Sequence, residues 1–402
     1  MGNPFASVGL AGHYTRFRVA HRLLLTGHSH QAWPDVAFDA QQRAWLDAAT
    51  LVDDKWQRAA AVADEVRAGW RRLLNDPTAI IALGQNTHEL LVRLLSAILP
   101  LFDHTAAAQQ RRGKLITTDG EFHTIRRQLD RLEEEGVTVL KIAARPGDTL
   151  SERIAAAVDD QTACVLVSSV LFDTAEIVPH LDAVAAACER HGATLLIDAY
   201  HHLNVIPFDV KAMGLANAFV IGGGYKYCQL GEGNAFMRVP PDCQLRPVLT
   251  GWFSEFAKLA EAKRPGEVRY GEGPARFAGA TYDPTSHYRA AAVFAFHQRM
   301  GLTADRLRAA SRHQVGMIER RLQSSDVNPA VAEIIPLPPE RRGGFLAIRC
   351  AQAAAVVFTL RARNVFADSR ADVLRLGPAP YLSDQQLREA GEILADVLKR
   401  AK

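Results

Sequence analysis

Short apolar runs alternate with helical segments through the middle of the chain, and this alternation constrains the fold more than any other feature. The apolar runs have the length of buried strands, and the helical segments are long enough to cross from one parallel strand to the next. The expected strands cover residues 79–83, 114–118, 138–142, 163–170, 194–198, 218–224 and 234–239. The expected helices cover residues 64–74, 125–136, 154–157 and 181–192, with a further one from about residue 87. The pattern therefore predicts an α/β domain on a large, mostly parallel sheet.

The pattern changes after the proline-rich stretch at residues 239–247. A long helix is expected to begin near Tyr288, and short strands with two helices follow from about residue 330. This part predicts a smaller C-terminal α+β domain. The expected division is an N-terminal segment at 1–45 that joins the small domain or a dimer interface, a large domain at 46–290 and a small domain at 291–402.

Composition is ordinary for a globular protein and excludes several classes of protein. Hydrophobic residues make up 48% of the chain and the net charge is +3, which indicates neither a disordered chain nor a strongly basic nucleic-acid-binding protein. No run of about 18 apolar residues is present, so a membrane-spanning helix is not expected. The first residues do not form a signal peptide, and we expect a cytoplasmic location. The five cysteines are scattered, and His28 and His30 lack clustered acidic or thiol residues, so no metal site is predicted.

The stretch at residues 195–233 carries the strongest chemical signal. Asp198 ends one expected strand, and Lys226 follows the next strand after a glycine-rich turn. Parallel strands present their carboxyl ends at one edge of a sheet, where open α/β domains bind ligands. A carboxylate and an amine facing each other there suit pyridoxal 5'-phosphate (PLP), whose aldehyde forms a Schiff base with lysine and whose ring nitrogen pairs with an acid. Taken alone, this pair is a weak signal, and coincidence is the simpler interpretation.

The complete sequence of residues 195–233 is more specific than the pair of Asp198 and Lys226 alone. The sequences DAYH at residues 198–201 and GYKY at residues 224–227 resemble motifs of kynureninase and its relatives in the class-V aminotransferase group of fold-type-I PLP enzymes. The resemblance implies the fold-type-I PLP-dependent transferase architecture, with PLP as cofactor. It assigns the Schiff base to Lys226, the ring nitrogen to Asp198 and the phosphate region to Tyr225, and these three residues are the expected catalytic group. It also places His201 near the ring.

Further motifs follow in the order that the same family shows. The turn at residues 84–91 lies where relatives bind the cofactor phosphate at a helix N-terminus, although an ordinary helix cap explains it equally well in isolation. Phe122 matches the residue that stacks on the pyridine ring, but residues 122–125 lack the acidic member that kynureninases carry there. Thr281 is expected to reach the partner subunit's cofactor. The full set of implied cofactor contacts is Asn86, Thr87, Phe122, Thr124, Thr174, Asp198, His201, Tyr225, Lys226, Trp252 and Thr281.

Residues 366–382 resemble the kynureninase stretch in which an arginine holds the α-carboxylate of the substrate. Arg375 takes that position, and its planar fork suits a carboxylate. Asp368 and Arg370 are expected to form a supporting pair. Ser29 matches a second substrate-binding position of the family, in the stretch at residues 23–34.

The resemblance implies a PLP-dependent hydrolase of the kynureninase type that forms a homodimer with shared active sites. Its small-molecule substrate is then kynurenine or a related aryl-oxo amino acid, cleaved between Cβ and Cγ to alanine and an aromatic acid, as in tryptophan catabolism. Two alternatives stay open. One is another class-V reaction, such as a C–S or C–C lyase or an aminotransferase on a different amino acid, and the other is a binding protein that has lost PLP chemistry. Neither a nucleic-acid nor a membrane partner is expected.

Overall fold

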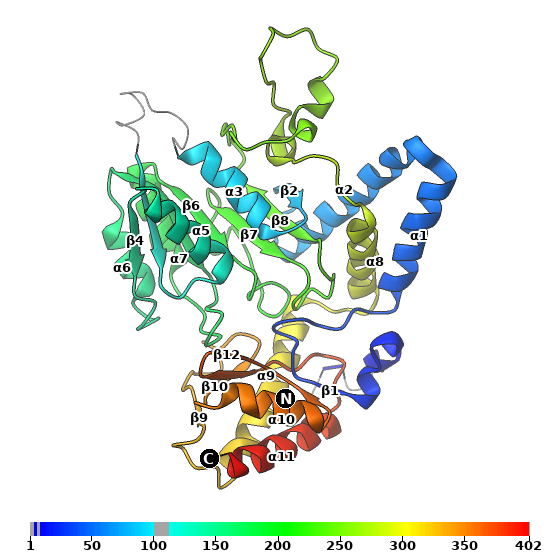
Figure 1. The fold of residues 1–402 in the computed structure, drawn as a ribbon, viewed down its shortest axis with the longest axis vertical. Coiled ribbons are helices and arrows are strands. Elements are labelled where there is room, and N and C mark those ends of the chain that lie inside the picture. The colour runs from blue at the N-terminus through cyan, green and yellow to red at the C-terminus, as the bar shows by residue number, and fades with distance from the viewer. Residues whose placement is uncertain (1–3, 6–8, 100–111, 402) are drawn as a thin grey trace.

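Two sheets of different size organise the chain in the computed structural model (Figure 1). The structure describes residues 4–5, 9–99 and 112–401. A seven-stranded sheet lies in the larger part, and a four-stranded antiparallel sheet lies in the smaller part, toward the C-terminus. The architecture is therefore α/β, with a large sheet domain and a smaller C-terminal domain.

The large sheet is mostly parallel. Its strand order is β2-β8-β7-β6-β5-β3-β4, and among these described strands β8 alone runs antiparallel to its neighbours. Parallel neighbours need a crossover connection, which explains the helices that follow β2, β3, β4 and β5. The strands are β2 (Ile80–Gly84), β3 (Lys114–Thr118), β4 (Val139–Ile142), β5 (Thr162–Ser168), β6 (Thr194–Asp198), β7 (Phe219–Gly223) and β8 (Ala235–Val239).

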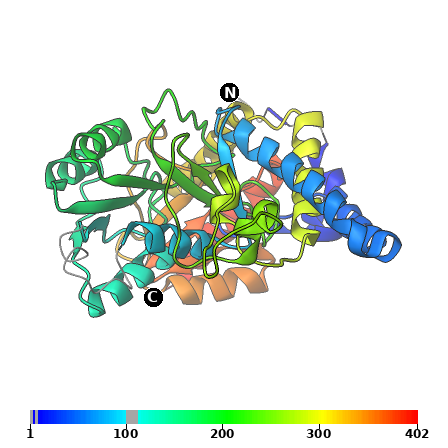
Figure 2. The ribbon, with the colours of Figure 1, turned by 90° about the horizontal axis from the view of Figure 1, so that it is seen from above.

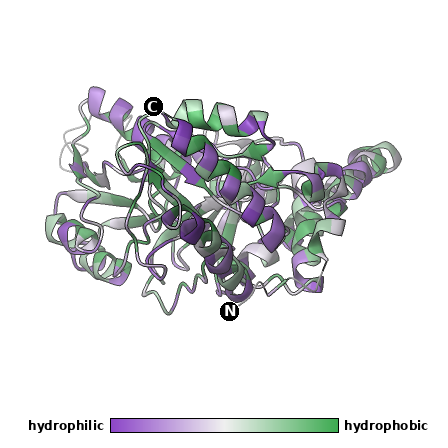
Figure 3. Cartoon of the chain, turned by 90° about the horizontal axis from the view of Figure 1, so that it is seen from below, coloured by the Kyte–Doolittle hydropathy of each residue, from purple (hydrophilic) through white to green (hydrophobic). Residues whose placement is uncertain are grey.

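Helices cover both faces of this sheet. Val165 of β5 belongs to the core under α2, α6, α7 and α8, whereas its neighbour Leu166 belongs to the core under α3 and α5. Because both faces are buried, the strands are continuous apolar runs. Figure 3 shows the same division, with apolar strands inside and helices that turn polar sides outward. The helices are α2 (Lys55–Leu73), α3 (Thr87–Ile98), α5 (His123–Glu134), α6 (Leu150–Ala157), α7 (Leu181–His191) and α8 (Thr285–Arg299).

The structure confirms the predicted α/β class and locates a strand at each of the expected runs from β2 to β8. Gly192 ends α7 as expected, in a left-handed conformation with φ of 63°. Helix α1 (Val36–Leu51) has no counterpart in the sequence-based prediction. It buries small residues such as Ala37 and leaves Trp45 74% exposed, so its apolar positions do not follow the period of a core helix.

The small domain packs helices against its four-stranded sheet, and the N-terminal segment joins the same core. Leu10, Tyr14 and Leu25 lie in one apolar cluster with residues of the small-domain helices. Helix α8 contributes Phe294 to the large-domain core and Phe296 to this second core. The domain limits at 45 and 290 stay predictions. The elements are β9 (Glu333–Ile334), β10 (Leu346–Arg349), β12 (Asp368–Arg370), β13 (Val373–Leu376), the parallel pair β1 (Leu23–Leu24) with β11 (Val365–Phe366), α9 (Ala304–Gln323), α10 (Ala353–Ala362) and α11 (Asp384–Arg400).

Two parts of the chain extend away from the large sheet. The segment between β8 and α8, with the 3-10 helices η5 (Trp252–Lys258) and η6 (Gly273–Phe277), projects beyond the sheet in Figure 1. The pair α1 and α2 extends to one side in the view from above (Figure 2). Both parts expose large apolar side chains, among them Trp252 at 47% and Trp45 at 74%. Among the described residues, the structure has no helix that is both long and apolar enough to cross a membrane.

Candidate active site

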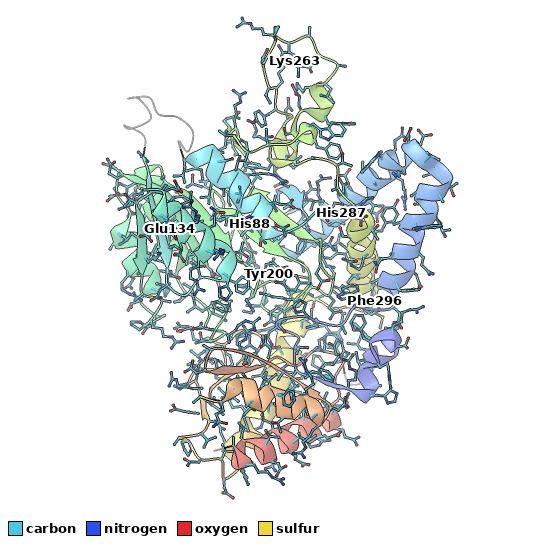
Figure 4. The ribbon with its side chains drawn as sticks, in the orientation of Figure 1. His88, Glu134, Tyr200, Lys263, His287 and Phe296 are labelled. Atoms are coloured by element: carbon cyan, nitrogen blue, oxygen red, sulfur yellow. The ribbon has the colours of Figure 1, made fainter. Side chains whose placement is uncertain are left out.

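The carboxyl edge of the large sheet brings Asp198 and Lys226 into one place. Asp198 is the last residue of β6 and pairs with Ile221 of the neighbouring parallel strand β7. The turn after β7 carries Lys226, so both side chains emerge at the edge that the sequence predicted. Gly223, the last residue of β7, lies against the ring of Tyr200, which a Cβ at this position would overlap. Figure 4 shows Tyr200 between the large sheet and the small domain.

Lys226 is buried among aromatic rings and a histidine. Its Nζ lies 2.8 Å from Nε2 of His201, 4.5 Å from the ring centroid of Tyr200 and 5.2 Å from that of Phe122. Burial lowers the pKa of Lys226 from 10.5 to about 7, although the charge of Asp198 acts in the opposite direction. A substantial fraction of this amine is therefore neutral near pH 7, which is the form that attacks an aldehyde or accepts a proton.

Asp198 and His201 complete the set of polar groups around this amine. Burial raises the pKa of Asp198, while a hydrogen bond of 2.8 Å from the backbone N–H of Tyr200 and the charge of Lys226 favour the carboxylate. Burial and the charge of Lys226 hold the pKa of His201 well below its usual value, so its imidazole is neutral. Nδ1 of His201 is buried and has no hydrogen-bond partner within the described residues. The site therefore presents a carboxylate, an amine of which a substantial fraction is neutral, and an imidazole nitrogen that is available for a hydrogen bond with a ligand.

A cavity of about 250 Å³ lies beside these residues. One end of it is formed by the start of α3, where the side chain of Asn86 accepts a hydrogen bond of 2.9 Å from the backbone N–H of Glu89. The remaining N–H groups of a helix start favour a bound anion. The lining residues are Gln85, Asn86, Thr87, His88, Phe122, Thr124, Ser168, Val170, Phe172, Asp198, Tyr200, His201, Tyr225, Lys226, Glu232, Gly233, Asn234 and Ala235.

A second buried carboxylate, that of Glu121, binds the end of strand β5 beside Asp198. Glu121 is 0% exposed and accepts hydrogen bonds from the hydroxyl of Thr118 at 2.7 Å and from the backbone N–H of Ser168 at 3.1 Å. The hydroxyl of Ser168 donates to its other oxygen at 2.5 Å. Burial raises the pKa of Glu121 to about 7, and the charge of Asp198 adds to this shift. Because Ser168 pairs in register with Asp198, Glu121 fixes the strand end next to the site.

Arg375 lies in the small domain, just behind the residues that line the cavity. Its Nε and Nη2 donate to the two carboxylate oxygens of Asp368 at 3.0 and 2.5 Å. Its Nη1 donates to the backbone oxygen of Phe172, a lining residue, at 2.6 Å. His28 is fully buried and its Nε2 lies 2.7 Å from Asp368. Burial lowers the pKa of His28 to about 4, so the neutral ring donates to Asp368 and helps to orient Arg375.

Several known proteins are similar to this chain in sequence or in structure. A family model of the kynureninase C-terminal domain matches residues 307–394. A kynureninase of Bacillus cereus is 28% identical over 272 residues, covering 65% of this chain and 61% of that protein's length. An uncharacterised aminotransferase of Bacillus subtilis is 23% identical over 356 residues, covering 87% of this chain and 88% of that one. A solved structure of a C-DES mutant with glycine covalently linked to its PLP cofactor matches with a TM-score of 0.79 at 18% identity, covering 96% of this chain and 99% of that chain.

The chain is thus kynureninase-like in sequence. The family model covers Arg375 together with most of the small domain. The structural likeness extends over nearly the whole chain and establishes the fold.

The cavity gathers many, though not all, of the residues that the sequence singled out. The lining includes Asn86, Thr87, Phe122, Thr124, Asp198, His201, Tyr225 and Lys226. The other expected residues lie outside it in the single chain. Thr174 is buried and accepts from the backbone N–H of Glu176 at 3.3 Å, Ser29 donates to the backbone oxygen of Thr26 at 3.1 Å, and Arg375 is engaged with Asp368. Trp252 and Thr281 are exposed on the segment that projects before α8.

Several residues at the site did not stand out in the sequence. Ser168 could have been found, because it ends the strand beside β6 and so meets the same edge as Asp198. Glu121 carries no local signal, and the sequence pattern indicated His28 only as a candidate metal ligand, because the roles of both residues depend on contacts with residues far along the chain. His30 stacks on Tyr225 with ring centroids 4.9 Å apart, so the N-terminal segment reaches the site. Across the residues with described positions, no group of three or more His, Cys, Asp or Glu side chains could hold a metal ion.

Proposed function

We propose that the chain is a PLP-dependent enzyme that acts on an amino acid, with hydrolysis of the kynureninase type as its reaction. The observation that carries the proposal is the cavity in which Lys226, with a pKa lowered by burial to about 7, lies beside Asp198 and His201. The kynureninase match in the small domain supports the choice of reaction. The products are then alanine and an aromatic acid, formed by cleavage between Cβ and Cγ.

The residues present fit PLP. The start of α3, with Asn86 and Thr87, offers backbone N–H groups to the phosphate. Phe122 supplies an apolar ring to the cavity, and Asp198 supplies a carboxylate for the pyridine nitrogen. The buried Nδ1 of His201 is unpartnered within the described residues, which is consistent with a bound group beside it. The proposal assigns Tyr225, which lines the same cavity, to the phosphate region.

The chemistry divides between the cofactor and the protein. When bound, PLP supplies an aldehyde that captures amines and a ring that accepts electrons. Lys226 would hold the cofactor through its aldehyde, and the neutral Nζ of Lys226 would accept the Cα proton of the substrate. Asp198 would pair with the ring nitrogen and favour its protonated form, because a buried carboxylate favours a positive partner. Arg375 binds the α-carboxylate of the substrate, with His28 and Asp368 fixing its plane.

A second candidate is an aminotransferase or another class-V reaction on a different amino acid. Two observations favour keeping it. The Bacillus subtilis aminotransferase matches over 87% of this chain, whereas the Bacillus cereus kynureninase matches over 65%. In addition, Phe122 is followed by His123, Thr124 and Ile125, with no acidic residue where the kynureninase pattern has one.

A panel of amino acids tests the proposed function. The protein reconstituted with PLP is mixed with kynurenine, 3-hydroxykynurenine, cysteine and several α-keto acid and amino acid pairs, and products are identified by mass spectrometry. Release of alanine with anthranilate or its hydroxy derivative supports the hydrolase. Transfer of the amino group without C–C cleavage supports the aminotransferase. A protein that binds no PLP contradicts both.

The pKa of Lys226 leads to a prediction about cofactor loading. Attack on the PLP aldehyde needs the neutral amine, so the rate of reconstitution of the apoprotein should rise with pH and level off above about pH 7. An ordinary lysine, with a pKa of 10.5, would give a rate that still rises steeply between pH 8 and 10. Stopped-flow absorbance at fixed PLP concentration measures this profile. A continued rise through pH 9 would contradict the lowered pKa.

The proposal includes a homodimer with shared active sites. The segment that carries Trp252 and Phe256 exposes these rings at 47% and 59%, and Thr281 follows on the same segment. An apolar surface of this kind is suited to a second copy of the chain. We expect PLP retention to fall when the protein is diluted below the dimer dissociation constant, because Thr281 then no longer reaches the partner's cofactor. Retention that does not depend on protein concentration argues against a shared site.

A further inference from the structure

Two arginines of the small domain face a single carboxylate near the cavity. Arg375 occupies both oxygens of Asp368, at 3.0 and 2.5 Å. Arg370 reaches the same carboxylate only at 3.5 Å, from Nη1 to Oδ2, and donates to the backbone oxygen of Ser369 at 2.8 Å. His28 adds no positive charge near neutral pH, since burial lowers its pKa to about 4. One positive charge of this group is therefore left in excess over its carboxylate.

The excess charge belongs to Arg370, the more exposed of the two. Its side chain is 43% exposed, whereas that of Arg375 is 3% exposed and fixed on three sides. Arg375 is therefore held by three contacts, whereas Arg370 is held by the backbone oxygen of Ser369 and by one longer contact with Asp368. Arg370 is the last residue of β12, a strand that lies on the side of the small domain nearest the large sheet (Figure 1).

The charge of Arg370 acts on the cavity itself. Burial is the main cause of the lowered pKa values of Lys226 and His201, and the charge of Arg370 contributes to both. Both of these residues line the cavity. The charge of Arg370 also contributes to the lowered pKa of His123, whose Nδ1 lies 2.6 Å from Nη2 of Arg126.

Glu232 and Asp173 do not cancel this charge. Glu232 lines the cavity, but it comes from the segment before β8 and lies 3.7 Å from Nε2 of His30. Asp173 pairs with Arg145 at 3.0 Å. A substrate that places its α-carboxylate on Arg375 thus meets a second cation, Arg370, which shares the carboxylate of Asp368 with Arg375.

We propose that Arg370 forms a second anion subsite, which binds a carboxylate at the side-chain end of the amino-acid substrate or on the acid released from it. The inference rests on the proposed function and names the chemistry that its substrate or product must present. Hydrolysis at a γ-carbonyl creates a carboxylate at that end, and a dicarboxylic amino acid carries one from the start. A guanidinium beside the site is suited to either.

Pairs of an acid and its amide distinguish a carboxylate on the substrate from a carboxylate on the released product. The holoenzyme is titrated with L-aspartate against L-asparagine, with L-glutamate against L-glutamine, and with benzoate against benzamide, and apparent Kd values come from changes in the absorption of bound PLP. We expect at least one pair to favour the acid by about two- to fivefold, the size expected of a partly exposed ion pair. Preference among the amino acids assigns the carboxylate to the substrate, and preference for benzoate alone assigns it to the product.

Variants of Arg370 connect the preference to this side chain. Arg370→Gln should reduce the acid-to-amide ratio to near 1, and Arg370→Lys should keep part of it because the charge remains. Arg363→Gln is the matched control, since Arg363 is an exposed arginine on the same domain that pairs with Asp396 away from the cavity. A wild-type ratio near 1 in all three pairs, or an unchanged ratio in Arg370→Gln, overturns the subsite while PLP binding is intact. Loss of PLP binding in the wild type overturns the proposed function, and the subsite with it.

Discussion

Replacing Lys226 with alanine is expected to abolish covalent attachment of PLP and to lower activity by at least about 10³-fold, because the variant loses both the nucleophile and the base. Lys226 is the amine that the fold places in the cavity, 2.8 Å from His201 and beside three aromatic rings. The wild type should absorb near ~420 nm and should be labelled irreversibly after borohydride reduction, as expected of lysine-bound PLP. Mass spectrometry of the reduced protein locates the label.

Lys263→Ala is the matched control for this change. Lys263 lies on the projecting segment, far from Tyr200 in Figure 4, and pairs with Glu255 at 2.7 Å. The Lys263→Ala variant should keep the absorption band, the label and the activity of the wild type. If Lys226→Ala still takes up the label after borohydride, another lysine carries the cofactor and the assignment is wrong. Circular dichroism and gel filtration establish that both variants are folded.

Changing Arg375 to lysine is expected to cost about 10²–10⁴ in kcat/KM for α-amino acid substrates while PLP stays bound. Lysine keeps the charge but loses the planar fork, and disruption of a buried, hydrogen-bonded charge pair costs about 2–5 kcal/mol. The structure sharpens this prediction, since the Asp368 carboxylate and the Phe172 backbone oxygen already hold the fork in one plane. The loss should be much smaller for an amine analogue that lacks the carboxylate. Steady-state kinetics with both substrates give the comparison.

Arg349→Lys is the control for a general effect of the substitution on this sheet. Arg349 lies on β10, beside the strand that carries Arg375, and its exposed side chain contacts Glu333 at 3.4 Å. The Arg349→Lys variant should have the same kcat/KM as the wild type. Equal losses of Arg375→Lys on both substrates, or a large fall in its melting temperature, make Arg375 a structural residue, and the α-carboxylate must then bind elsewhere.

The fold was largely predictable because its strands are buried on both faces. Such strands are continuous apolar runs, and the runs at β5, β6 and β7 could be placed from the sequence to within a few residues. The meeting of Asp198 and Lys226 followed from a single topological rule for parallel sheets. Helix α1 escaped prediction because it buries alanines and exposes Trp45, contrary to the usual amphipathic pattern.

The rest of the site depends on contacts that a linear pattern does not encode. His28 and Asp368 are 340 residues apart, yet they share a hydrogen bond of 2.7 Å that orients Arg375. Glu121 precedes Phe122 without any motif of its own, and its burial against Ser168 becomes visible only when β3 and β5 are paired. Trp252 and Thr281 lie outside the cavity of the single chain, so their expected cofactor contacts stay predictions that depend on a second subunit.

Helix α8 joins the two cores without a break, since Phe294 packs into the large core and Phe296 into the small one. An α-helix bends far less readily than a loop, and residues two positions apart point to nearly opposite sides of it. The small domain is thus joined to the large domain by a stiff helix and not by a flexible loop. Its orientation, and with it the distance from Arg375 to the amine of Lys226, is set when the helix folds. Because this distance is fixed, the pocket selects ligands by the spacing between their charged ends.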